Sequence, residues 1–250
     1  MDNFLTFISR DDKFKLNWRK MKSSKKIGKF IVIDGADGSG KKTQTDLLVK
    51  HLISCGYDVK VADFPRYGER SATMVEDYLN GKFGNAKSVS SRVSSIFFAI
   101  DRYAASFEIK NWLAEGKIVI SNRYVSANMG HQTGKIKGKV ERDKFLNWLD
   151  ELEFGIFNIP RPDKNIFLYV DPAIGQKLVD KKGHRDYVGG TKRDIHEADI
   201  NHLKDAVKAY LYVAKKYNWD TIKCFNKLGM RSIDDIATDI WQKVEAVLKP

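Results

Sequence analysis

Cysteine is scarce in this chain, and its scarcity excludes a fold held together by disulfides. The 250 residues contain only Cys55 and Cys224, which lie far apart and match no metal-ligand spacing. Disulfide frameworks are typical of oxidising compartments, so we expect a protein of the cytoplasm. Long hydrophobic runs are also missing. The unbroken apolar runs are short, as Ile96–Ile100 illustrates. Because a membrane-spanning helix needs about 20 apolar residues, we expect no membrane association.

Acidic residues are in deficit, and the net charge is +12. Such a surplus raises the hypothesis of nucleic-acid binding. Half of it, however, comes from the first 29 residues, where nine lysines and arginines face three aspartates. This segment lacks the apolar core of a secretory signal, and its aspartates argue against a transit peptide. We interpret residues 1–28 as a basic, disordered extension and expect no nucleic-acid partner.

Short apolar runs alternate with helical patterns over residues 29–250. The runs are rich in isoleucine and valine and apolar at consecutive positions, which is typical of parallel strands covered on both faces. Five runs are present, at Phe30–Ile33, Val59–Ala62, Ile118–Ile120, Ile166–Val170 and Thr221–Cys224. Helical patterns cover residues 41–54, 89–114, 195–217 and 232–248, with Gly56 as a stop and Ser232 as an N-cap. The alternation predicts one α/β domain, a five-stranded parallel sheet flanked by helices.

A glycine-rich segment directly follows the first predicted strand and opens the first predicted helix. Glycines allow the backbone to fold tightly around phosphates, and a helix N-terminus adds positive potential. The lysine that ends the segment is expected to reach the β- and γ-phosphates of a nucleotide. Strand, glycine-rich turn and helix together predict an ATP-binding P-loop. Its residues are Gly35, Ala36, Asp37, Gly38, Ser39, Gly40 and Lys41.

The position after Lys41 departs from the P-loop pattern. A serine or threonine there would offer a hydroxyl to Mg²⁺, but the chain has Lys42 followed by Thr43. Because an ammonium group has no lone pair, Mg²⁺ binding is either weakened or transferred to nearby carboxylates. Asp37, which stands in the glycine-rich segment itself, is such a carboxylate. We count Lys42 and Thr43 among the ATP-binding residues and Asp37 among the metal-binding ones.

Two arginines follow separate predicted strands. Arg66 stands in F-P-R-Y-G after the second strand, and Arg123 stands in N-R-Y after the third. The carboxyl ends of parallel strands converge on one crevice, and guanidinium groups bind phosphate in bidentate fashion. Phe98 and Arg102 lie one helical turn apart, an arrangement that suits stacking on a base and hydrogen bonding to its edge. Taken alone, Phe98 is more typical of a core residue, and Arg66 and Arg102 are more typical of ion-paired or solvated side chains.

In order along the chain, these motifs resemble those of the thymidylate kinases. The resemblance runs from about Lys29 to the C-terminus. It rests on D-G-S-G-K, F-P-R-Y, F-A-x-D-R, R-Y, a P-D before the fourth strand, and a basic lid ending in D-x-x-E. It implies the fold of P-loop nucleoside monophosphate kinases, with a short lid at about residues 181–193. It further implies ATP and Mg²⁺ as cofactors, a homodimer, and phosphorylation of dTMP to dTDP in nucleotide biosynthesis.

The resemblance also assigns roles to individual residues. Arg66 and Arg123 would hold the acceptor phosphate, and Phe98 would stack on thymine. Arg102 and Asn128 would read the polar edge of the base, and Gln132 belongs to the same substrate-binding set. In the lid, Arg185, Lys192 and Arg193 are candidates for stabilising the transferring phosphoryl group. The implied catalytic set is Lys41, Arg123, Arg185 and Arg193, and the implied metal set is Asp37, Asp194 and Glu197.

Two further positions differ from the family pattern and leave alternatives open. Members often have aspartate where Asn122 stands, and an aromatic residue, which helps to exclude a ribose 2′-hydroxyl, where His131 stands. The acceptor is therefore dTMP or another nucleoside monophosphate. A deoxynucleoside kinase would not need two phosphate-binding arginines, and a P-loop ATPase would want a carboxylate ending a strand beside the P-loop strand. Lys42 and Asn122 together motivate a non-catalytic nucleotide sensor.

Overall fold

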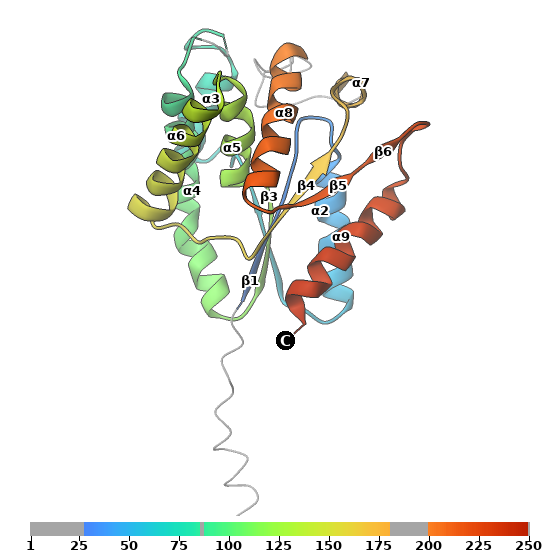
Figure 1. Cartoon of the computed structure of the whole chain (residues 1–250). Helices are drawn as coiled ribbons and strands as arrows, with labels where there is room; N and C mark the ends of the chain where they lie inside the picture. The colour runs from blue at the N-terminus through green and yellow to red at the C-terminus, as the bar shows by residue number, and fades with distance from the viewer. Residues whose placement is uncertain (1–27, 86–87, 181–199, 250) are drawn as a thin grey trace, which may run out of the picture.

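A five-stranded parallel sheet forms the centre of the molecule (Figure 1). The computed structural model describes residues 28–85, 88–180 and 200–249. The predicted extension, apart from Gly28, and the predicted lid lie outside these ranges. The strand order is β2-β3-β1-β4-β5, and each neighbouring pair is parallel. The strands are β1 (Lys29–Asp34), β2 (Val59–Asp63), β3 (Ile118–Asn122), β4 (Lys164–Tyr169) and β5 (Asp220–Lys223). The predicted sheet is thus confirmed.

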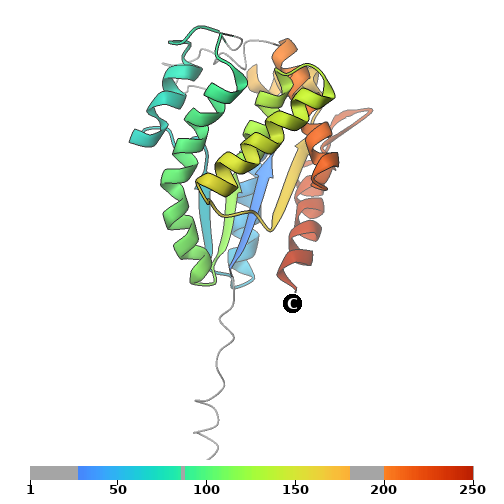
Figure 2. The same cartoon turned by 60° about the vertical axis from the view of Figure 1, so that its left-hand side comes forward.

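Helices cover both faces of this sheet. One face carries α2 (Lys41–Ser54) and α9 (Ile233–Leu248). The other carries α4 (Ser91–Ala114), α5 (Val125–Gly134) and α8 (Ile200–Lys216), and Figures 1 and 2 show the sheet between the two groups. Outside this second layer, α6 (Lys139–Asp150) packs against α4 and α5.

The two-sided covering explains the consecutive apolar residues of the strands. Successive side chains of a strand point to opposite faces. In β1, Ile31 and Ile33 pack with residues of α2 and α9. Phe30 and Val32 pack on the opposite face with residues of α4 and α5. All four side chains are fully buried, so these four consecutive positions must be apolar.

The predicted helices are found close to their expected bounds. Ser232 caps α9, since its hydroxyl accepts a hydrogen bond of 3.1 Å from the Asp235 amide. Ser90 caps α4 in the same way through the Val93 amide. The helix predicted over 195–217 is described from Ile200 onward as α8, and residues 195–199 lie outside the described part.

Several elements have no counterpart in the expectations. They are α3 (Thr73–Leu79), α5, α6, α7 (Pro172–Asp180), a π-helical segment (Glu151–Ile156) and an antiparallel ribbon of β6 (Phe225–Asn226) and β7 (Gly229–Met230). Most residues of α5 are buried although many are polar, so it has no amphipathic pattern to detect. Cys55 and Cys224 are free thiols. Among the described helices, none is long and apolar enough to cross a bilayer.

Candidate active site

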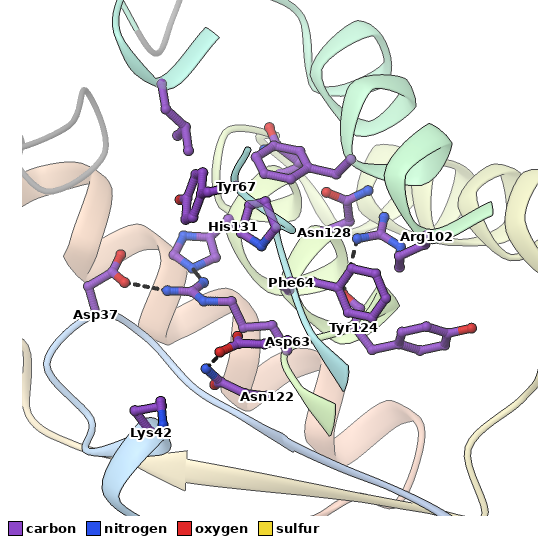
Figure 3. Close-up of a pocket in the computed structure, with 16 residues that line it drawn as sticks. Asp37, Lys42, Asp63, Phe64, Tyr67, Arg102, Asn122, Tyr124, Asn128 and His131 are labelled. Carbon is purple, nitrogen blue, oxygen red and sulfur yellow. Dashed lines mark hydrogen bonds and ion pairs between the residues drawn. The ribbon is translucent and has the colours of Figure 1, made fainter. Parts of the chain in front are cut away.

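A cavity of about 300 Å³ opens at the carboxyl ends of β2 and β3, beside the P-loop (Figure 3). Two of its walls come from α4 and α5, as expected for a crevice at the carboxyl ends of parallel strands. Most of the predicted substrate-binding residues line it, and so do two of the P-loop region. The former are Phe98, Arg102, Arg123, Asn128 and Gln132, and the latter are Asp37 and Lys42.

The P-loop has the backbone of a phosphate cradle. Gly38 has φ of +79°, and a Cβ atom there would lie 2.1 Å from the carbonyl oxygen of Gly175 in α7. Only glycine fits both the conformation and the space. The Lys41 ammonium folds back over the loop and donates to the carbonyl oxygens of Gly35 (2.9 Å) and Ala36 (3.0 Å). Since the N-terminus of α2 follows directly, the loop fits the phosphates of ATP.

Arg123 joins the P-loop to the acceptor side of the cavity. It follows β3 directly, and its backbone has φ of +64°, a value uncommon outside glycine. Its amide donates to the Ile33 carbonyl of β1 (3.0 Å). Its Nη2 donates to the Asp37 carboxylate, and its Nη1 lies 3.1 Å from His131 Nε2. Burial alone would lower the pKa of Arg123. The nearby carboxylates, Asp37 first, raise the pKa by more than burial lowers it, so the net shift is upward. The cavity therefore holds a permanent cation.

His131 is buried beside Arg123, and sequence reasoning gave it no such contact. Burial lowers its pKa well below the ordinary histidine value, although Asp37 opposes the shift. The ring stacks on His202 of α8 at 5.8 Å and meets Tyr210 edge to face at 5.5 Å. Both partners come from a helix about 70 residues downstream. No local pattern signals this packing, because it depends on how α8 lies against α5.

Arg102 is anchored by a residue that the sequence did not single out. Its Nε and Nη2 each donate to a different oxygen of Glu153 at 2.6 Å. Its Nη1 donates to the Tyr124 carbonyl (3.3 Å). Asn128 lies in the same group, with Nδ2 3.0 Å from the Ser95 carbonyl and 3.4 Å from Glu153. Arg102 and Asn128 thus share Glu153 as a partner at the cavity wall, and Glu153 accepts most of the hydrogen bonds of Arg102.

Arg66 differs from the other predicted phosphate ligand in its position. It is not among the residues that line the cavity, whereas its neighbours Pro65 and Tyr67 are. Its amide and its Nε both donate to the Asp101 carboxylate at 2.9 Å, and its Nη2 donates to Ser71 (2.7 Å). In this structure Arg66 fastens its loop to α4 through Asp101.

The position of Phe98 is compatible with both of the roles that its sequence context allowed. It packs edge to face against Tyr78 of α3 at 6.2 Å, in a small apolar cluster with Val75 and Leu79. It also lines the cavity, so a ring face is available for a base. Gln132 is held nearby, because its Oε1 accepts a hydrogen bond of 2.8 Å from Ser94.

Of the three predicted metal ligands, Asp37 lies within the described residues. Asp37 lines the cavity next to the P-loop, and its carboxylate suits Mg²⁺. Lys42 is also a lining residue of the cavity, but its ammonium contacts Asp46 at 2.7 Å. Near it, Asn122 donates to Asp63 (2.8 Å), as Figure 3 shows, and burial raises the pKa of Asp63.

The other predicted metal ligands and the predicted lid residues fall in a part of the chain that the structure does not describe. No group of three or more metal-ligating side chains occurs within residues 28–85, 88–180 and 200–249. Asp194, Glu197 and the basic lid residues Arg185, Lys192 and Arg193 lie outside the described residues. The described part therefore offers Asp37, which lies in the P-loop itself and lines the cavity, as a metal-binding carboxylate.

Comparisons with known proteins point to one family. A family model described as thymidylate kinase matches residues 33–229. The thymidylate kinase of Plasmodium falciparum is 29% identical over 229 residues, covering 91% of this chain and 94% of its own. A probable thymidylate kinase of Pyrococcus horikoshii is 33% identical over 215 residues, with 85% and 94% coverage. The solved structure of Candida albicans thymidylate kinase has a TM-score of 0.64 at 22% identity, covering 88% of this chain and 92% of that one. The last likeness bears on the fold alone.

Proposed function

Since this chain belongs to the thymidylate kinase family, we propose that it transfers the γ-phosphate of ATP to dTMP, forming dTDP and ADP. One structural observation supports this reaction in addition to the family membership. The partly buried cation Arg123 lies in a cavity between the P-loop and an aromatic wall, in contact with Asp37 of that loop. An acceptor phosphate bound to Arg123 would face the donor phosphates of ATP.

The two halves of the site divide the work of phosphoryl transfer. The P-loop backbone and Lys41 bind the donor, and Arg123 binds the phosphate of dTMP. Phe98 stacks on thymine, and Asn128 with Arg102 contacts its polar edge. An oxygen of the dTMP phosphate attacks the γ-phosphorus, and the bond from that phosphorus to the β-phosphate oxygen breaks. Positioning and charge neutralisation supply most of the acceleration in such reactions.

Mg²⁺ fits the site through Asp37, with Asp194 and Glu197 as further proposed ligands. When bound, the ion neutralises charge on the donor phosphates. The proposed lid residues Arg185, Lys192 and Arg193 would add positive charge around the transferring group. We place the enzyme in the cytoplasm, a compartment that suits the two free thiols.

A homodimer is the form that we propose for the active enzyme. Five apolar side chains along α4 are at least 36% exposed and recur at spacings of three and four residues, which places them on one helix face. They are Val93, Ile96, Ile100, Tyr103 and Phe107. A two-fold contact is self-complementary, so the same stripe from a second copy covers it. An exposed stripe of this kind is typical of an interface.

A coupled ADP-release assay across nucleoside monophosphates, with and without Mg²⁺, tests the proposed reaction. We expect kcat/KM for dTMP to lie well above the values for dCMP, dGMP and AMP. Comparable values for a purine monophosphate would contradict the thymidylate assignment and leave the kinase class standing. The dCMP value serves as the control for pyrimidine size without the thymine methyl group.

A further inference from the structure

The guanidinium of Arg123 is held from two opposite elements. Asp37 of the P-loop accepts a hydrogen bond from Nη2, and His131 of α5 contacts Nη1 at 3.1 Å. A guanidinium carries five N–H groups in a fixed plane. Two contacts on different nitrogens fix the rotation of that plane and leave its other N–H groups for an anion. The direction in which Arg123 faces the cavity therefore depends on both partners.

The contact with His131 requires a neutral ring with a defined tautomer. Arg123 has only donors, so His131 Nε2 must accept, and the ring proton then sits on Nδ1. His131 is 5% exposed, and burial is the first of the causes that keep its pKa low. Arg123, His202 and Lys41 add to this lowering, and Asp37 opposes it. A charged ring would lack the lone pair and repel Arg123.

The position of the His131 ring is fixed by helix α8. His202 stacks on one side at 5.8 Å, and Tyr210 packs on the edge at 5.5 Å. Tyr210 is itself anchored, because its hydroxyl donates to Asp34 at the end of β1 (2.9 Å). A Cβ atom on Gly130 would lie 2.3 Å from the Tyr210 ring. This close packing leaves the imidazole little freedom to turn away from Arg123.

Without an acceptor at this place, Arg123 would have a competing partner. Arginine and carboxylate groups favour a bidentate pair with two parallel N–H···O bonds. Asp37 now receives a bond from Nη2, and rotation of the guanidinium would bring a second nitrogen onto the same carboxylate. Such a pair would turn the donors away from the cavity.

We propose that His131 is a positioning residue, which accepts a hydrogen bond from Arg123 and so keeps its remaining donors directed at the acceptor phosphate. This inference rests on the proposed function, since the phosphate is that of dTMP. It concerns the hydrogen bond to Arg123 and its effect on phosphate binding, which is separate from any contact of the ring with the sugar. His131 therefore affects the affinity for dTMP but not the affinity for thymidine, which lacks the phosphate.

Calorimetric titration of dTMP and of thymidine into five proteins tests the proposal. Two of them are single variants of His131: His131→Phe keeps an aromatic ring without an acceptor, and His131→Gln has an amide oxygen that can accept. The others are the parent, Arg123→Ala and the double variant Arg123→Ala/His131→Phe. Hydrogen bonds to charged groups are worth about 1.5–3 kcal/mol, so His131→Phe should weaken dTMP binding about tenfold or more. Thymidine binding should stay the same, and His131→Gln should recover most of the loss. In the Arg123→Ala background, His131→Phe should have little further effect.

Steady-state kinetics give a second readout. His131→Phe should raise KM for dTMP and leave KM for ATP unchanged. His51→Phe is the matched control, because His51 packs against Trp241 and does not line the cavity, and it should match the parent. Thermal unfolding without ligand checks that each variant is folded. If His131→Phe is not folded, the comparison of His131→Gln with the parent tests the proposal in its place.

Three outcomes would overturn the proposal. Equal losses for dTMP and thymidine would show that the ring only shapes the cavity. Unchanged dTMP binding in His131→Phe would show that Arg123 needs no second partner. A parent protein that binds thymidine but gains nothing from the phosphate of dTMP would remove both this inference and the proposed acceptor site. The first two outcomes leave the proposed kinase activity standing.

Discussion

Arg102 and Glu153 form a buried, bidentate ion pair with two N–H···O bonds of 2.6 Å. The side chains are 2% and 0% exposed. Because water does not reach them, each charge is stabilised by its partner. The pair ties α4 to the π-helical segment after α6 and places the guanidinium at the cavity wall. A residue expected to recognise a base is thus also a structural connection between two elements.

Removal of one partner should be costly, whereas removal of both should not. Truncating one member of a buried pair leaves an uncompensated charge and costs about 3–5 kcal/mol. We expect Arg102→Met to be destabilised by that amount in urea unfolding, and Arg102→Met/Glu153→Leu to recover most of it. Arg92→Met, on an exposed arginine of the same helix, is the control. An Arg102→Met protein as stable as the parent would show that Glu153 does not need this cation.

Lys42 should be dispensable, although it occupies the position where a hydroxyl would meet Mg²⁺. Its ammonium contacts Asp46 at the protein surface, and an exposed ion pair of this kind is worth about 0.2–1 kcal/mol. Lys42→Thr should keep activity and lower the Mg²⁺ concentration for half-maximal turnover about two- to fivefold. Asp37→Asn should raise it. Lys50→Thr, an exposed lysine further along α2, controls for the loss of charge in this titration at fixed ATP. An inactive Lys42→Thr would make Lys42 a catalytic cation.

Lys135 should make stability depend on pH in the alkaline range. Burial lowers its pKa to about 8, and its ammonium donates to the Tyr78 hydroxyl at 2.7 Å. In the unfolded chain its pKa is about 10.4, so between these values the unfolded state binds more protons. The contribution of this group to stability therefore rises with pH through that window. Below about pH 8 the cost of the buried charge is fully present, at up to about 3 kcal/mol.

Comparison of Lys135→Met with the parent isolates this effect. The variant lacks the buried charge, so its advantage in unfolding free energy should be largest at pH 7 and should shrink toward pH 10. Lys137→Met, at an exposed lysine two residues away, should show no such trend. A difference between Lys135→Met and the parent that is constant from pH 7 to pH 10 would mean that Lys135 titrates normally.

The apolar stripe on α4 should hold the dimer together. Ile100 lies at its middle and is 42% exposed. A charge placed there would be buried against a second copy, and central interface residues are worth 2 kcal/mol or more. Ile100→Asp should weaken dimerisation about 30-fold or more, as measured by light scattering over a concentration series. Ile53→Asp, at an isoleucine of α2 that is 57% exposed, is the matched control. A monomeric parent would contradict the proposed homodimer.

The sequence predicts the parts of this molecule that depend on local pattern. Consecutive apolar residues identify the strands because both faces of the sheet are covered, and the P-loop is recognisable because glycine is needed at fixed positions such as Gly38. The partners of the site arginines are different. Glu153 is 51 positions from Arg102, and His131 is placed by α8, so both contacts depend on tertiary packing. Asp101 stands in the F-A-x-D-R motif, but its hold on Arg66 becomes visible only in three dimensions.

The most direct test of the account is identification of the product formed from ATP and dTMP by chromatography. We expect dTDP and ADP in equal amounts. Arg123→Ala should remain folded and lose transition-state binding of about 2–5 kcal/mol, the range for truncating one partner of a buried charge pair. ADP without dTDP would make the protein a P-loop ATPase. ATP binding with no turnover of any monophosphate would make it a nucleotide sensor, and either result would contradict the central claim.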